Sequence, residues 1–174
     1  MNFKAARLLR NLYLAILVGT VATLGAVYAI HNTDPHHWGF VLGTTLDFIY
    51  GRELFTQVYV QYGVGIPLLF KAINFVWPIT YTNIGFLTSA VYAATLGVIF
   101  LSIEKLSSTK YAVALTVIAF LFHPYAVFPW PDYYAGFFLA LACYVLLPVS
   151  TTPTIRRDVL AGTLLFLAFF FRNT

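Results

Sequence analysis

The sequence predicts an all-α membrane protein with about five transmembrane helices and with amphipathic surface helices in its first outer loop. The first observation is composition, because the 174 residues are 60% hydrophobic, 18% aromatic and 9% charged, with a mean hydropathy of +0.82. A soluble domain carries about 25% charged residues, so most of this surface must face lipid. The other two observations are apolar stretches of membrane-spanning length and the placement of cations between them. Residues 1–174 form a single transmembrane domain in this prediction.

Five apolar stretches are candidate spans, because about 20 residues of helix are needed to cross about 30 Å of hydrocarbon. In chain order they are residues 8–30, 84–103, 111–128, 134–149 and 159–171. The last two are shorter, but turn-like or charged residues flank both. Residues 64–79 are ambiguous, since Lys71, Asn74 and Pro78 interrupt them and a lysine at mid-membrane costs about 2.5–3.5 kcal/mol.

The distribution of Lys and Arg decides whether residues 64–79 cross the membrane. Lys4, Arg7 and Arg10 precede the first stretch, which places the N-terminus in the cytoplasm under the positive-inside rule. If residues 64–79 stay outside, the later cations also fall inside; these are Lys105, Lys110, Arg156 and Arg157. We therefore expect residues 31–83 to be extracytoplasmic and to lie on the membrane surface.

Three further features restrict the class of the protein. The net charge is +4, but the ten Lys and Arg are scattered and form no patch, which disfavours nucleic acid as a partner. The lone Cys143 allows no disulfide within the chain. A cleaved signal peptide is the alternative for the first stretch, but that stretch is longer than the usual apolar core of about 7–15 residues.

The first outer loop opens with HNTDPHHWGF at residues 31–40, where three of the four histidines gather. Asp34-Pro35 predicts a helix start, with the acid at the N-cap and proline in the first turn. Apolar residues then recur at helical spacing and Gly51 suits the stop, which indicates an amphipathic helix on the outer leaflet. In this interpretation Asp34 caps a helix and His36 and His37 face water. The alternative is a chemical role for Asp34 at the outer face.

Two charged residues later in the chain are candidates for the same outer site. Asp132, in FPWPDYY, is the only acid of the second outer loop, so it can converge with Asp34; a simple turn role is its alternative. The 15 residues from Arg157 to Arg172 cover about 22 Å of helix, which leaves Arg172 short of the outer boundary. A guanidinium there suits a phosphate group, and snorkelling to the interface is its alternative.

The chain resembles a known family in the segment TDPHHWGFVLGTTLDFIYGRELFTQVYVQYGVGIPLLF. This segment is similar to the first outer loop of the C-type integral membrane glycosyltransferases, which include protein mannosyltransferases and bacterial lipid A aminoarabinose transferases. Gly51, Phe55, Tyr62 and Gly63 follow the family outline, whereas Gln57 and Val64 depart from it. HPYAVFPWPDYYAGFFLALACYVLL and LAGTLLFLAFFFRNT resemble two later segments of the family. Because family members have many more spans, the resemblance implies that this chain is the N-terminal part of a longer domain.

The resemblance implies transfer of a sugar from a polyprenyl-phosphate carrier to an acceptor at the extracytoplasmic face, with inversion. It makes Asp34 the general base and gives Asp132 a role in binding the acceptor or shaping the pocket. The cations that would hold the donor phosphate are Arg172, Arg52 and Lys71. The side chains expected to contact the substrate are His36, His37, Gln57, Tyr59 and Gln61.

The expected partners are membrane lipid, a polyprenyl-phosphate-linked sugar, and an acceptor glycan, lipid or protein; the expected location is the plasma (inner) membrane of a bacterium. Some family members use a divalent cation and others do not, and the histidine spacing matches no specific metal site. Two alternatives remain. One is a non-catalytic membrane subunit or transporter fragment, and the other is a histidine-based metal or haem protein of the membrane.

Overall fold

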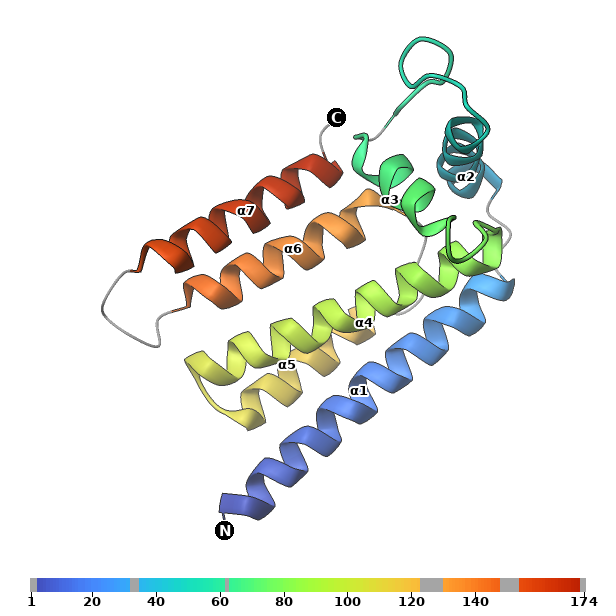
Figure 1. Ribbon diagram of the computed structural model, residues 1–174. Helices are drawn as coiled ribbons and strands as arrows, with labels where there is room; N and C mark the ends of the chain where they lie inside the picture. Colours follow the sequence, from blue (N-terminus) through green and yellow to red (C-terminus); the bar gives the residue numbers. More distant parts are fainter. Residues whose placement is uncertain (1–2, 32–34, 62, 123–129, 148–153, 173–174) are drawn as a thin grey trace.

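The computed structural model describes residues 3–31, 35–61, 63–122, 130–147 and 154–172, and this part of the chain is all-α. It contains seven helices (Figure 1). They are α1 (Phe3–His31), α2 (Pro35–Ile49), α3 (Gly65–Ile73), α4 (Tyr81–Leu106), α5 (Thr109–Phe122), α6 (Pro131–Leu146) and α7 (Ile155–Arg172). The predicted fold class is therefore confirmed at the level of an all-α protein.

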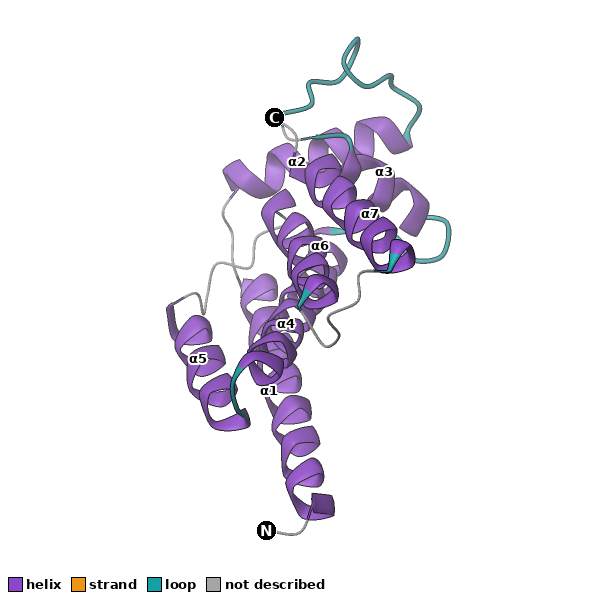
Figure 2. Cartoon of the chain, turned by 90° about the vertical axis from the view of Figure 1, so that its left-hand side faces the viewer, coloured by secondary structure: helices purple, strands orange, loops and turns teal. Residues whose placement is uncertain are grey.

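Helices α1, α4, α5, α6 and α7 form a layered bundle, and α2 and α3 gather at one end of it (Figure 1). Helix α4 packs against α1, α5 and α6, and α6 packs against α7. Helix α2 contacts α3, which also contacts the C-terminal part of α7. Figure 2 shows α5 on the side of the bundle away from α7. We call the end that carries α2, α3 and the last turn of α7 the α2–α3 end.

Two helices are long and apolar enough to be candidate membrane spans. These are the Arg7–His31 part of α1 and the whole of α4, Tyr81–Leu106. Helices α5 and α6 are apolar but have 14 and 16 residues, and the predicted stretches 111–128 and 134–149 run beyond them into residues outside the described part. Helix α7 carries charged residues at both ends. The prediction of five spans is thus supported by the structure for α1 and α4 as candidates.

The surface segment also takes the form that the sequence predicts. Helix α2 begins at Pro35 and ends at Ile49, and Gly51 follows with φ +94°, a conformation that glycine adopts without steric cost. Helix α3 has nine residues and so covers only about 14 Å. A helix of this length cannot cross a bilayer by itself, and the placement of residues 64–79 on the outer surface stays a prediction.

The outer faces of the long helices are apolar. Large hydrophobic side chains are exposed along α1, α5 and α7, among them Leu12, Ile16, Leu115, Leu121 and Phe166. Several Ser and Thr hydroxyl groups inside the bundle donate to the carbonyl four residues earlier, as Thr88 does to Ile84 at 2.9 Å. The buried hydroxyl of Thr45 in α2 has no hydrogen-bond partner among the described residues. Apolar exteriors and satisfied interior polar groups are the pattern expected of helices in lipid.

Charged side chains gather at the opposite end of the bundle from α2 and α3. The start of α1 and the end of α4 meet there, and Arg10 lies 3.7 Å from Glu104. Lys105 lies over the ring of Tyr144, 3.5 Å from its centroid, while the first turn of α7 holds Arg156, Arg157 and Asp158. This arrangement keeps most cations of the described helices at one end of the bundle.

Close contact at Gly65 docks α3 on α7, and this contact predicts the effect of a single methyl group. A Cβ at Gly65 would lie 2.9 Å from Cδ1 of Phe171 and 3.1 Å from the carbonyl oxygen of Phe170. We expect Gly65→Ala to lower the free energy of unfolding by about 1–3 kcal/mol, because overpacking forces backbone shifts. Thermal unfolding in detergent or nanodiscs measures it.

The matched control is Gly136→Ala in α6, where a Cβ meets nothing within 4 Å. Alanine in a helix interior is favoured over glycine by about 0.5–1 kcal/mol, so this variant is expected to be as stable as the wild-type protein or more so. Equal stability of the two alanine variants would contradict the close docking of α3 on α7.

Candidate functional site

Asp132 and Arg172, two of the residues predicted for the site, form an ion pair at the α2–α3 end. Asp132 lies in the first turn of α6 and Arg172 in the last turn of α7, and Nε of Arg172 contacts Oδ1 of Asp132. The antiparallel packing of α6 on α7 brings them together from positions 40 residues apart (172 minus 132). Each charge also suits its helix terminus. Both side chains are about half exposed, so solutes can reach the pair.

Beneath the ion pair, an aromatic cluster holds α6, α7 and α3 in place. Tyr134 is buried and shares a 3.1 Å hydrogen bond with the hydroxyl of Thr88 in α4. Its ring stacks on Phe171 with centroids 5.7 Å apart and meets the edge of Phe70 of α3 at 6.0 Å. No motif in the sequence pointed to these residues as part of the site. A tyrosine inside an apolar stretch was the available signal, because a buried Tyr hydroxyl needs a partner.

The loop at residues 50–64 is organised around Glu53. The main-chain N–H of Glu53 donates to Oε1 of Gln57 at 3.0 Å, and the N–H groups of Gln57 and Val58 donate back to the Glu53 carbonyl. Gln57 therefore holds the turn together. Within this turn Phe55 has φ +71°, a sparsely populated conformation for a non-glycine residue, and its ring is exposed. Tyr59 is also exposed, and its carbonyl accepts a 3.2 Å hydrogen bond from Thr44 of α2.

Two cavities adjoin this loop, and Gln61 lines both. The larger has a volume of about 470 Å³ and lies between the loop and the C-terminal half of α7; it is lined by Phe55, Val60, Gln61, Gly63, Val64, Phe166, Phe169 and Phe170. Its size falls within the range of about 300–1,000 Å³ typical of ligand pockets. It is rich in aromatic side chains, and Gln61 supplies amide hydrogen-bonding groups. Of the predicted substrate-contacting residues Gln57, Tyr59 and Gln61, it is Gln61 that lines this cavity.

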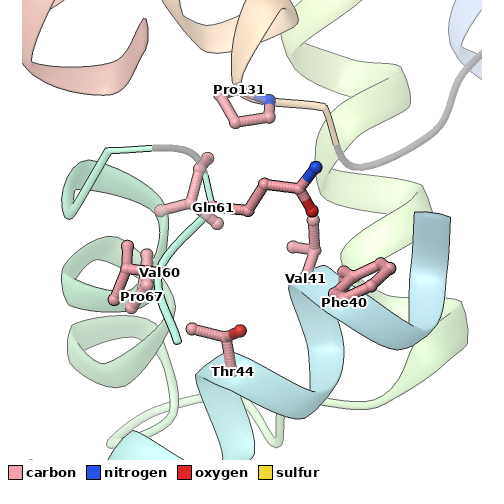
Figure 3. A pocket seen from close by; sticks show the side chains of 8 residues that line it. Phe40, Val41, Thr44, Val60, Gln61, Pro67 and Pro131 are labelled. Carbon is pink, nitrogen blue, oxygen red and sulfur yellow. The ribbon is translucent and has the colours of Figure 1, made fainter. Parts of the chain in front are cut away.

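The smaller cavity, about 20 Å³, lies between α2, α3 and the start of α6. Figure 3 shows the Gln61 side chain reaching across it toward Val41, with Pro131 on the far side. The volume is enough for about one water molecule. Because Pro131 directly precedes Asp132, this cavity lies next to the start of the helix that carries Asp132.

The other two cations predicted to bind phosphate also contact protein groups. Lys71 donates a 3.1 Å hydrogen bond to the Phe48 carbonyl, and its ammonium lies 3.9 Å from the centroid of the Phe48 ring. It therefore caps the C-terminus of α2. Arg52 lies 3.2 Å from Asp47, and both are exposed to solvent. Exposed ion pairs contribute only about 0–1 kcal/mol, so Arg52 and Arg172 can change partner at little cost, whereas Lys71 is half-buried.

The remaining predicted residues lie at the start of α2. Asp34, the predicted base, lies outside the described residues and immediately precedes Pro35, the first residue of α2. His36 and His37 belong to the first turn of that helix, and His123 lies outside the described part. Within the described residues, no group of three or more His, Cys, Asp or Glu side chains is arranged to hold a metal ion.

Searches against protein-family models, curated proteins and solved structures find no match to this chain. The α2–α3 end carries the exposed Asp132–Arg172 pair. A cavity lined by Gln61 and by aromatic side chains of the loop and α7 lies at the same end.

Proposed function

We propose that the chain belongs to a membrane glycosyltransferase that moves a sugar from a polyprenyl-phosphate carrier to an acceptor at the extracytoplasmic face. The observation that carries this proposal is the exposed Asp132–Arg172 pair at the α2–α3 end. It supplies a cation for a lipid phosphate and a carboxylate for a hydroxyl group. The surface loop and its aromatic cavity adjoin the same end.

The proposal places the five helices of the bundle, α1, α4, α5, α6 and α7, across the membrane, with the α2–α3 end outside. Support comes from the two candidate spans, from the apolar exteriors of the other helices and from the cations at the opposite end. A donor lipid lying in the outer leaflet then presents its phosphate near the last turn of α7. Pairing with protein cations is the usual way for such a charge to be held at the edge of the membrane.

The proposed reaction is a single displacement at the anomeric carbon. The base, which the resemblance assigns to Asp34, takes the proton of the acceptor hydroxyl, and the acceptor oxygen attacks the anomeric carbon. The bond from that carbon to the phosphate oxygen breaks, and the polyprenyl phosphate leaves with the electron pair. Arg172 exchanges Asp132 for the phosphate and stabilises the growing negative charge. Asp132, once released, accepts a hydrogen bond from a substrate hydroxyl.

A turnover assay tests the proposed function. Membranes containing the naturally expressed protein are given polyprenyl-phosphate sugars labelled in the sugar, together with an extract of envelope glycans, lipids and proteins. We expect release of polyprenyl phosphate and label in the acceptor fraction, above the level in membranes lacking the protein. Donor that crosses the membrane intact would instead indicate a transporter. Donor that is neither cleaved nor moved across the membrane would indicate a non-catalytic subunit.

A further inference from the structure

The loop between α3 and α4, residues 74–80, presents apolar side chains outward. Phe75 is 86% exposed and Val76 is 87% exposed, and Trp77 beside them is 37% exposed. No charged residue occurs between Lys71 and Glu104. Two adjacent large apolar side chains held almost fully away from the protein cost free energy in water, at about 25 cal/mol for each Å² of apolar surface. The loop therefore needs another apolar medium.

The main chain of the same loop is hydrogen-bonded from within. The N–H groups of residues 74–77 all donate to carbonyls of α3, at 2.9–3.4 Å. Pro78 has no N–H group, and the N–H of Ile79 donates to Oδ1 of Asn74 at 3.0 Å. The Pro78 carbonyl accepts a 2.8 Å hydrogen bond from Nδ2 of Asn83. A loop in water has no need to satisfy its own donors so completely, whereas a loop in contact with lipid does.

The position of the loop specifies where in a bilayer it would lie. It ends at Thr80, whose hydroxyl accepts a 3.2 Å hydrogen bond from the Asn83 N–H and caps α4. Helix α4 is a candidate span, so the loop lies at the depth where that span leaves the hydrocarbon. Tryptophan is enriched at this boundary. On the other side the loop continues from α3, whose buried residues Ile66 and Phe70 pack into the core.

We propose that the α3–α4 loop inserts into the outer leaflet. Phe75 and Val76 enter the acyl region and Trp77 lies at the level of the headgroups. The inserted loop fixes the depth of α3, and through the α2–α3 contact it fixes the depth of the surface helices that border the site. This inference requires the membrane placement proposed above and is independent of sugar transfer.

Site-directed spin labelling tests the insertion. Because Cys143 is the only cysteine, Cys143→Ser gives a cysteine-free background. Phe75→Cys or Val76→Cys is added to it singly and carries the spin label, and both substitutions alter exposed side chains. Leu115→Cys, on the exposed face of α5, is the lipid reference, and Ser107→Cys, in the α4–α5 turn at the opposite end, is the water reference. The protein is reconstituted in nanodiscs of phosphatidylcholine and phosphatidylglycerol. Collision with oxygen, which partitions into lipid, and with a water-soluble nickel chelate is then measured.

We expect the labels at 75 and 76 to gain oxygen accessibility and lose nickel accessibility, as at Leu115 and unlike at Ser107. Nickel accessibility at 75 and 76 equal to that at Ser107 would overturn the inference. Protection from both reagents would overturn it as well, because a second copy or another protein would then cover the loop. Nickel access at Leu115 would mean that α5 does not lie in the bilayer, and the membrane placement would fail together with the inference. None of these readings depends on the turnover assay.

Discussion

Arg172→Gln is expected to lower the rate constant for sugar transfer by about 10²–10³-fold, the usual loss when one preorganised donor to a developing oxyanion is removed. The structure suggests that the fold will tolerate the change. The guanidinium is about half exposed and its pair with Asp132 lies at the protein surface, so its loss costs about 0–1 kcal/mol of stability. Initial rates at saturating donor, together with thermal unfolding of the same preparations, measure both effects.

Asp132→Asn is the matched variant that distinguishes a catalytic role of the ion pair from a purely structural one. If the pair only ties α6 to α7, Arg172→Gln and Asp132→Asn lower stability by similar small amounts and leave transfer unchanged. If Arg172 binds the donor phosphate, Asp132→Asn frees the guanidinium, and the KM for the donor falls. The rate constant for sugar transfer also falls, because a substrate hydroxyl loses the carboxylate that accepts its hydrogen bond. Unequal kinetic effects with equal stability therefore support the proposal, and equal rates for both variants and the wild-type protein contradict it.

The helices of this chain follow closely from local sequence signals. Asp34-Pro35 predicted the start of α2, and Gly51 predicted its end, because backbone geometry at helix termini depends on a few adjacent residues. Charge placement predicted that residues 64–79 do not cross the membrane, and α3 is too short to cross. The predicted stretches 111–128 and 134–149 continue into residues outside the described part, so their lengths stay predictions.

The site could be predicted only in part, because its contacts join distant segments. The predicted topology singled out Asp132 and Arg172 by their positions, but their pairing depends on the antiparallel packing of α6 on α7. Lys71 was predicted to bind phosphate, and its contact with the Phe48 carbonyl shows a capping role that no local pattern contained. The exposure of Phe75 and Val76 could likewise not be predicted from the sequence, because a short apolar run is compatible with either a buried or an exposed segment.

Asp34→Asn is expected to lower sugar transfer by about 10²–10⁴-fold, the contribution typical of a general base. The substitution is well suited to the question because Asn and Asp are about equally good N-caps. If Asp34 only caps α2, which begins at Pro35, the asparagine variant should equal the wild-type protein in both stability and turnover.

The companion variant Asp34→Ala completes the argument. It removes the predicted cap as well as the carboxylate, so it is expected to cost about 1 kcal/mol of stability in addition to the loss of turnover. A general base therefore predicts that both variants lose transfer, whereas only the alanine variant loses stability. A capping role predicts that the asparagine variant is normal and that the alanine variant is less stable. Two measurements on two proteins thus separate the two roles, because a side-chain amide can cap a helix but cannot take a proton from a hydroxyl group.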